Sequence, residues 1–535
     1  MSPSDATDPG SHEPGFFSPA PITILLAYSS GTESLTESTT FTNLLPIGIC
    51  SLHALLRSHG HQAHLANLSG MSQTQIRELF SQLKPDLVGF SQWTHNRHVT
   101  LKLARIAKQV APDCTVMLGG GHATYQAEAI LEQHSEVDLI VAGEGEETLL
   151  ELIAALYQHQ PLTAVAGLVL RDSGSISRTK PRLRIKDLDS LPYPGRYLHE
   201  AIGVDLDLQP QFISTSRGCP SACRFCASPT FWGRTVRTRS PSSVVDEFLF
   251  QRQQFGTIYL SLRDDTFTAD QRRTLELSKL LLERRADMLW NCQTRVESVD
   301  EEVLTWMKRA GCECVQLGVE SGSARILQEL GKRITPEQVI QACDAVHRVG
   351  LQLSVYLIAG VPGETPADQQ ATLKLLRRIR PHDLQVAPLA YYPGTALFSD
   401  ALRHHTVASD LFEHTRSDAL LALPDGNRRT TQLLRAAGDL SIPLSNRRIS
   451  ELKQRIGYCA VTCLQAGDHY LQQGSLERAE AEYREITLTE PEHPWGWLLL
   501  AELYDETGRT DQARSCYRQL LKLVPRHRQA QQALS

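Results

Sequence analysis

Three closely spaced cysteines constrain this chain more than any other feature of its sequence. Cys219, Cys223 and Cys226 stand in the run SRGCPSACRFCASP with the spacing C-x3-C-x2-C. Thiolates are soft, anionic ligands suited to iron–sulfur clusters, and three of them on one tight loop can hold three irons of a four-iron cluster. The fourth iron is then open to a small molecule that binds through an amino and a carboxylate group. The loop therefore predicts a cluster that takes part in chemistry.

The alternative interpretation of this loop is a structural zinc site. Structural zinc usually takes four ligands, commonly from two paired knuckles. No second C-x2-C or C-x2-H pair follows the loop in the sequence. An iron–sulfur cluster is therefore the better prediction.

Downstream of the cysteines, short apolar runs alternate with helical patterns. The runs are QFISTS, TIYLSL, CVQLGV, QLSVYLI and DLQVAPL, and the helical patterns between them include TPEQVIQACDAVHRVG. This alternation is typical of βαβ units and a parallel sheet. Over residues 211–400 we expect six strand and helix pairs in a partial (β/α)6 barrel, with its chemistry at the C-terminal ends of the strands.

The same region resembles the radical S-adenosylmethionine (radical SAM) enzymes. The resemblance rests on the cysteine spacing and on five later motifs in order, YLSLRDDTF, WNCQTRV, CVQLGVESGS, LIAGVPGET and PLAYYPGT. It implies that the cysteines bind a 4Fe-4S cluster whose open iron chelates S-adenosylmethionine. An added electron then cleaves this cofactor to a 5′-deoxyadenosyl radical, which abstracts hydrogen. It further implies cofactor contacts from Phe225, Glu320, Ser321 and Gly360.

Two pairs of residues in the barrel motifs can have a structural role instead of, or in addition to, contact with substrate or cofactor. Asp264 and Asp265 could contact substrate or cofactor, or they could cap the helix that follows, because aspartate is a preferred N-cap residue. Gly360 and Gly363 could simply form a turn, and a turn is compatible with cofactor contact.

Residues 21–160 form a second alternating segment. Strands are predicted at ITILLAY, AHLAN, DLVGFS, CTVMLGG and DLIVAGE, and helices at 45–60, 71–84, 97–112 and 146–160. The rhythm predicts a doubly wound sheet, which binds ligands at the carboxyl ends of its strands. Glycines there let a large flat group or a phosphate tail lie against bare backbone. The strand ends carry Ser91, Gly119, Gly120, Gly121, Gly143, Glu144 and Gly145.

This segment resembles the cobalamin-binding domain that precedes the barrel in one large class of radical SAM enzymes, the class B methyltransferases and their relatives. The resemblance rests on LPIGICSLHALLRSHGH and on the turns GGGHAT and GEGEET, and it implies a bound cobalamin. The D-x-H-x-x-G motif of many other cobalamin proteins does not occur in the sequence, so the lower face of the cobalt is unassigned. His122 is either a ligand there or a turn residue.

The C-terminal segment, residues 464–535, contains an internal repeat with a period of 34 residues. Such a period is the signature of tetratricopeptide repeats, which are helix pairs that usually bind a protein segment in a concave groove. Two repeats must bury a face by packing on the barrel or on another chain, so a packing cap and a partner site are both open. Gly474, Ala479, Tyr483 and Pro491 recur as Gly508, Ala513, Tyr517 and Pro525.

The remaining segments carry fewer signals. We expect a disordered tail at 1–20, a connector at 161–210 with one strand, and a helical extension at 401–463 that serves as packing or as a substrate lid.

Composition limits the partners and the compartment. The 535 residues carry a net charge of −6 without a concentrated basic stretch, which argues against nucleic acid, and no apolar run of about twenty residues predicts a membrane span. The first twenty residues do not resemble a secretory signal. Most other cysteines lie in apolar patterns, as in a reducing compartment. We therefore expect a cytoplasmic enzyme that receives electrons from a donor protein.

Three functions are consistent with these features. The first is cobalamin-dependent methyl transfer to an unactivated carbon of a small molecule, lipid or peptide. The second is a radical cyclase or rearrangement enzyme with the same cofactors. The third is an interaction protein whose tetratricopeptide repeats dominate over a vestigial barrel.

Overall fold

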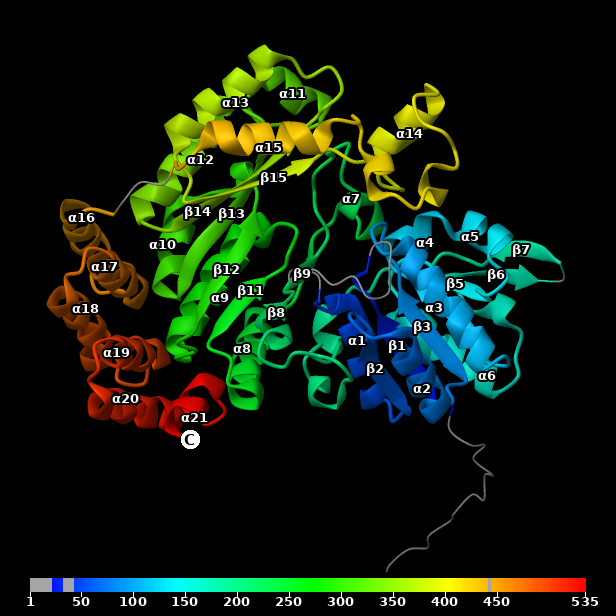
Figure 1. The fold of residues 1–535 in the computed structure, drawn as a ribbon, viewed down its shortest axis with the longest axis horizontal. Coiled ribbons are helices and arrows are strands. Elements are labelled where there is room, and N and C mark those ends of the chain that lie inside the picture. The colour runs from blue at the N-terminus through cyan, green and yellow to red at the C-terminus, as the bar shows by residue number, and fades with distance from the viewer. Residues whose placement is uncertain (1–21, 32–42, 173, 441–443) are drawn as a thin grey trace, which may run out of the picture.

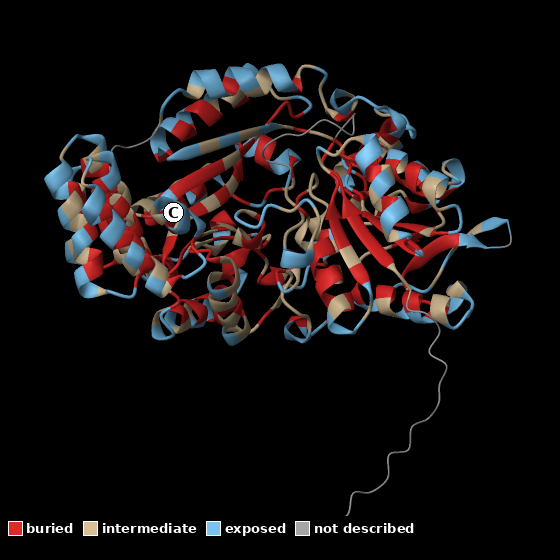
Figure 2. Cartoon of the chain, turned by 60° about the horizontal axis from the view of Figure 1, so that its bottom comes forward, coloured by how far each residue is buried: buried red, intermediate tan, exposed pale blue. Residues whose placement is uncertain are grey.

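The structure is a computed structural model that describes residues 22–31, 43–172, 174–440 and 444–535 (Figure 1). Two α/β units lie side by side, and a helical C-terminal unit packs on the second of them (Figure 1). The strands of both sheets are largely buried, whereas the outer helices expose one face (Figure 2). The tail expected at 1–20 lies outside the described residues.

The N-terminal unit is a seven-stranded sheet in the order β2-β1-β3-β4-β5-β6-β7. Strands β1 to β5 are parallel, and β6 and β7 are antiparallel additions. The expected doubly wound sheet is therefore confirmed. The strands are β1 (Ile24–Tyr28), β2 (Ala63–Asn67), β3 (Leu87–Ser91), β4 (Thr115–Gly119), β5 (Leu139–Val141), β6 (Leu168–Asp172) and β7 (Ser175–Arg178).

Helices cover both faces of this sheet because successive strand residues point to opposite sides. Leu25 and Ala27 belong to one buried core, with α2, α3 and α5, whereas Ile24 and Leu26 belong to the other, with α1 and α6. The helices are α1 (Ile47–Ser58), α2 (Gln73–Leu83), α3 (Arg97–Val110), α4 (Gly121–Tyr125), α5 (Ala127–Gln133) and α6 (Glu146–Tyr157).

The sheet continues beyond residue 160, where we expected the connector to begin. Strand β6 pairs with β5 and covers an edge that would otherwise present unpaired backbone groups, and β7 completes a hairpin with β6. The single strand expected in the connector is thus part of the first unit.

The second unit is a six-stranded parallel sheet in the order β15-β14-β13-β12-β11-β8, which confirms the expected partial barrel. Its outward side chains pack on helices α8, α9, α10, α12 and α13. The strands are β8 (Phe212–Ile213), β11 (Tyr259–Leu262), β12 (Leu289–Thr294), β13 (Cys312–Glu320), β14 (Gln352–Ala359) and β15 (Asp383–Pro388). The helices are α8 (Pro241–Phe255), α9 (Gln271–Glu283), α10 (Glu301–Arg309), α12 (Pro336–Val349) and α13 (Pro366–Ile379).

The sixth covering helix comes from the expected helical extension. Directly after β15 the chain forms α14 (Ala396–Arg403), and the helix that packs on β15 and β14 is α15 (Gly426–Ala437). Helix α14 and the segment that follows it share a small core that includes Phe398 and Phe412. This segment reaches the first unit, where the Arg97 Nε donates to the carbonyl oxygen of Phe412 at 2.7 Å.

Six helices follow α15, and four of them form two tetratricopeptide helix pairs. The pairs cross closely because the repeat positions are small, and both Ala479 and Ala513 are fully buried. No helix in the described segments combines the length and apolar character needed to cross a membrane. The helices are α16 (Asn446–Ile456), α17 (Ala460–Gln472), α18 (Leu476–Thr489), α19 (Pro494–Glu506), α20 (Thr510–Leu523) and α21 (Arg528–Leu534).

The repeats pack on the barrel at the end opposite the cysteine loop. The Trp495 Nε1 donates to the carbonyl oxygen of Ile258, just before β11, at 2.8 Å. The buried Lys308 Nζ donates to the Gln465 Oε1 at 3.2 Å and to the carbonyl oxygen of Gly350 at 2.7 Å. The chain itself thus supplies the packing surface that a short array needs. A protein partner on the remaining surface stays a prediction.

Replacing Gly256 by alanine tests this junction. Gly256 ends α8 with a φ of +72°, and a Cβ there would lie 2.3 Å from the carbonyl oxygen of Arg526. The matched control is Gly474→Ala, because Gly474 has the same φ and nothing within 4 Å of such a Cβ. We expect the control to lose about 1 kcal/mol of unfolding free energy, and Gly256→Ala to lose roughly 1–3 kcal/mol more, in denaturant titrations. Equal losses in the two variants would contradict a tight junction.

Candidate functional site

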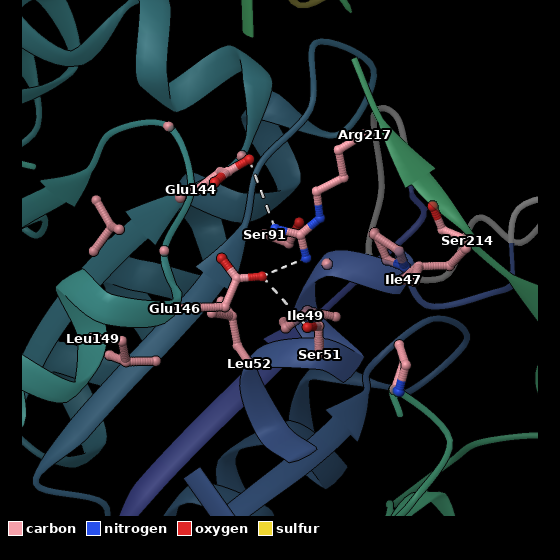
Figure 3. Close-up of a pocket in the computed structure, with 18 of the residues that line it drawn as sticks. Ile47, Ile49, Ser51, Leu52, Ser91, Glu144, Glu146, Leu149, Ser214 and Arg217 are labelled. Atoms are coloured by element: carbon pink, nitrogen blue, oxygen red, sulfur yellow. Dashed lines mark hydrogen bonds and ion pairs between the residues drawn. The ribbon is translucent and has the colours of Figure 1, made fainter. Parts of the chain in front are cut away.

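A cavity of about 330 Å³ lies between the carboxyl ends of the first sheet and the mouth of the barrel (Figure 3). Its walls on the first unit include Ser91, Gly119, Gly120, Gly143, Glu144 and Gly145. Its walls on the second unit include Ser214, Ser216, Arg217, Arg263 and Asp265. The strand ends of the first unit, where the sequence predicts a ligand site, thus line a cavity that they share with the second unit. Of the predicted strand-end residues, Gly121 does not line it and lies beside Trp93 instead.

Glycines keep the first wall of the cavity open. A Cβ on Gly48 or Gly143 would meet nothing within 4 Å, so a side chain there would project into free space. Gly120 has a φ of +97° and its Cβ would lie 2.7 Å from the carbonyl oxygen of Gln92, so this turn requires glycine. Below the glycines, apolar side chains from the sheet and from α1 and α6 continue the wall: Leu26, Ile49, Leu52, Met117, Val141 and Leu149.

Buried ion pairs join the two units across the cavity. The Arg217 Nη2 lies 2.6 Å from the Glu146 Oε1, and Arg237 pairs with Glu144 (Figure 3 draws the contacts of Arg217). Both carboxylates are nearly inaccessible, with 6% of Glu144 and 4% of Glu146 exposed. Removing one partner would leave an uncompensated buried charge, which is strongly destabilising. Glu144 therefore holds the two units together. The sequence had predicted a cofactor contact for this residue and gave no sign of the ion pair.

The three cysteines lie on one loop between β9 (Ser216–Arg217) and α7 (Ser228–Phe231). The Ser221 Oγ lies 3.2 Å from the Cys223 Sγ, and the Arg295 Nη1 donates to that sulfur at 3.6 Å. A cation and a hydroxyl therefore lie beside a sulfur that would bind iron. Burial raises the pKa of Cys226 in the metal-free chain, and a bound cation would reverse this effect.

Four further predicted residues lie on the barrel side, and none of them lines the cavity. Phe225 packs on a small apolar cluster that includes Leu330, and the carbonyl oxygen of Leu330 accepts from the Arg224 backbone at 2.9 Å. Glu320 ends β13 with a φ of +69°. Its Oε1 lies 2.9 Å from the Nζ of the buried Lys332.

Ser321 and Gly360 occupy structured turns at neighbouring strand ends. The Ser321 Oγ accepts from the backbone of Ser323 at 3.1 Å and lies 3.2 Å from the Thr372 Oγ1. Gly360 has a φ of +76°, and its backbone donates to the Glu364 Oε2 at 3.0 Å. A turn is thus present at Gly360, and cofactor contact at these positions remains a prediction.

The two aspartates after β11 do not cap a helix. The N-cap of α9 is Asp270, so the capping interpretation is wrong for both residues. The Asp264 carboxylate instead accepts from the backbones of Thr215 and Ser216, at 2.6 and 3.1 Å, and holds the strand end ahead of the cysteine loop. Asp265 lines the cavity and accepts from the Ser228 Oγ at 2.9 Å, and burial raises the pKa of its carboxyl.

His122 does not line the cavity. Its Nδ1 lies 3.1 Å from the Thr94 Oγ1, and its ring meets the edge of Phe412 at a centroid distance of 5.3 Å. Burial lowers the pKa of His122 to about 3. His122 is thus a packed side chain rather than the predicted turn residue that bonds its own backbone, and a ligand role stays a prediction.

Comparison with protein families decides the class of the chain. Residues 213–376 match the radical SAM superfamily, residues 38–153 match the B12 binding domain, and residues 470–535 match the tetratricopeptide repeat. An uncharacterized methyltransferase of Pyrococcus horikoshii is 30% identical over 76% of this chain and 89% of its own length. The chain is a radical SAM enzyme with an N-terminal B12-binding domain. Both resemblances noted in the sequence are confirmed.

This radical SAM enzyme is also similar to a cyclase and to a methyltransferase of known structure. An anaerobic magnesium-protoporphyrin IX monomethyl ester cyclase of Rubrivivax gelatinosus is 29% identical over 67% of this chain and 66% of its own length. The solved structure of the methyltransferase TsrM from Kitasatospora setae, with cobalamin and a [4Fe-4S] cluster bound, aligns with a TM-score of 0.62 over 87% of this chain and all of that chain. At 16% identity this similarity concerns the fold alone.

The residues of the chain fit the cofactors of these two domains. Three thiols on one loop, with one cation beside them, are a donor set for iron, and no fourth cysteine completes a closed site on that loop. The glycine positions and the apolar wall give a large ring and its tail a surface without protruding side chains.

The cluster assignment predicts the iron content of cysteine variants. Replacing Cys223 by alanine should remove the iron and the brown absorbance of anaerobically reconstituted protein, where the unaltered chain holds about four irons. Cys314→Ala is the matched control, because Cys314 is a half-buried thiol on β13 away from the loop. Full iron content in the Cys223 variant would refute the assignment.

Proposed function

We propose that this radical SAM enzyme transfers a methyl group from cobalamin to an unactivated carbon of its substrate. One observation carries the proposal: the cavity has its first wall on the B12-binding unit and its second on the barrel, beside the cysteine loop. A substrate held there can be reached from both cofactor sites.

The chain's own residues would hold the two groups at opposite walls. Cys219, Cys223 and Cys226 would ligate the cluster, and Phe225, Glu320, Ser321 and Gly360 would surround S-adenosylmethionine. Gly119, Gly120, Gly143 and Gly145, with Ser91, would lie against the cobalamin. When bound, the cluster supplies a 5′-deoxyadenosyl radical from S-adenosylmethionine, and cobalamin supplies a methyl group.

The remaining residues would fix the distance between the two walls and exclude water from the cavity. The pairs of Arg217 with Glu146 and of Arg237 with Glu144 hold the walls at one separation. Apolar side chains around the cavity keep the reacting carbon away from water, which limits side reactions of a reactive radical. Asp265, whose pKa is raised by burial, can keep its proton at a higher pH than an ordinary aspartate and act as a hydrogen-bond donor.

A second candidate is a radical cyclase with the same cofactors, and the 29% identical cyclase of Rubrivivax gelatinosus favours it. The methyltransferase relative covers more of both chains. The third interpretation, an interaction protein with a vestigial barrel, has little support, because the cysteine loop, its neighbouring cation and the cavity are all present.

The cobalamin site can be tested by filling it. Gly48 begins α1 at the cavity wall, and a Cβ there meets nothing within 4 Å. Gly48→Leu should therefore abolish the cobalamin absorbance of the loaded protein while iron content and the folded circular-dichroism spectrum stay unchanged. Ser58→Leu is the control, because Ser58 is exposed at the far end of the same helix. Normal cobalamin content in the Gly48 variant would place the cofactor elsewhere.

S-adenosylmethionine with a trideuterated methyl group separates the two candidate reactions. Anaerobic incubation with a reductant should yield 5′-deoxyadenosine in either case, which mass spectrometry detects. For a methyltransferase, the deuterated methyl group should also be recovered in the cobalamin fraction and in any product. A cyclase should leave the cobalamin fraction unlabelled. Absence of 5′-deoxyadenosine from protein with full iron content would eliminate both reactions.

A further inference from the structure

Arg263 is a cation of the shared cavity that has no counter-charge. It follows Leu262, the last residue of β11, and therefore lies at the C-terminal end of the barrel strands. It lines the cavity, and its side chain is exposed. Within the described parts of the chain, no carboxylate lies within ion-pair distance of its guanidinium. The other arginines of the wall are paired, Arg217 with Glu146 and Arg239 with Glu247.

The direction of the Arg263 side chain follows from the alternation of side chains along β11. Leu260 and Leu262 are buried in the core that faces the outer helices, so Ser261 and Arg263 point into the barrel. The guanidinium lies over the ring of Phe212 on the adjacent strand, with its carbon 4.7 Å from the ring centroid. This cation–π contact restrains the guanidinium, and its N–H groups can still donate to a ligand.

The acidic residue nearest in sequence that lines the cavity does not neutralise this charge. Asp265 accepts a hydrogen bond from the Ser228 Oγ instead, and no ion pair joins it to Arg263. Asp264 is occupied by the backbones of Thr215 and Ser216. A positive charge therefore remains beside the proposed substrate site.

The inner face of the barrel below Arg263 is polar. The Ser261 Oγ donates to the Asn291 Oδ1 at 2.8 Å, and the Asn291 Nδ2 donates to the Tyr259 hydroxyl at 2.7 Å. Further along the sheet, the Tyr356 hydroxyl of β14 donates to the Gln316 Oε1 of β13 at 2.9 Å. Such a surface suits a molecule that forms hydrogen bonds.

We propose that Arg263 binds an anionic group, a carboxylate or a phosphate, of the substrate, and so selects acidic substrates. This inference rests on the proposed function only in taking the cavity as the substrate site. A planar guanidinium restrained by a cation–π contact presents two parallel N–H groups, which match two oxygens of a carboxylate or phosphate. Neutral lipids of similar size would leave this cation uncompensated.

The test compares molecules that differ only in their charge. The full chain, with cluster, cobalamin and S-adenosylmethionine bound, is titrated by equilibrium dialysis with two pairs of probes. Protoporphyrin IX against its dimethyl ester examines a carboxylate, and cytidine monophosphate against cytidine examines a phosphate. We expect the acid of at least one pair to bind about tenfold more tightly than its neutral partner, and the pair concerned identifies the anionic group.

Variants assign any such preference to Arg263. Arg263→Gln should reduce the ratio of the two dissociation constants to about threefold or less. Arg272→Gln, which changes an exposed arginine on α9, should leave this ratio unchanged.

The inference is overturned if neither pair shows a preference, if both acids fail to bind, or if the ratio is retained in Arg263→Gln. Loss of cobalamin or S-adenosylmethionine binding in that variant also overturns it, because Arg263 would then serve a cofactor. Formation of 5′-deoxyadenosine by the unaltered chain is scored separately, and its failure concerns the proposed function alone.

Discussion

The structure depends on the buried ion pairs that join its two α/β units. Arg217 and Arg237 come from the short strands that flank the cysteine loop. In the first unit, Glu146 begins α6 and Glu144 lies in the turn before it. Negative charge at the first turn of a helix is also favourable in itself. Because each charge is buried, the paired arrangement is stable only when both units are in place, and the cavity exists only between them.

This arrangement links the cysteine loop directly to the B12-binding unit. Arg217 lies two residues before Cys219, so the contact that fixes the first unit also fixes one end of the loop. The Asp264 carboxylate holds the same end through the backbones of Thr215 and Ser216, and Phe225 packs near the other end. Two reactive groups on separate domains can act on one carbon only if their separation is fixed, and these contacts supply that restraint.

Local patterns predicted most of the fold but not how its parts meet. Strand positions, the cysteine loop, the glycine turns and the 34-residue repeat could all be identified because each is encoded within a few neighbouring residues. The pair of Arg217 with Glu146 spans 71 residues of sequence and leaves no local pattern. For the same reason α15 was not recognised as the sixth barrel helix, since the segment that precedes it leaves the barrel first. Asp264 and Asp265 were ambiguous because aspartate serves capping, backbone clamping and catalysis alike.

The segment between β15 and α15 has a consequence for ligand exchange. After leaving the barrel it contacts the B12-binding unit, where Arg97 donates to the backbone of Phe412, and it then returns as the helix that covers β15. The last strand of the barrel is therefore tethered on both sides by one continuous stretch of chain. Separation of the two units would break the contact of Arg97 with Phe412, so this segment adds to the restraints on how far the cavity can open when ligands exchange.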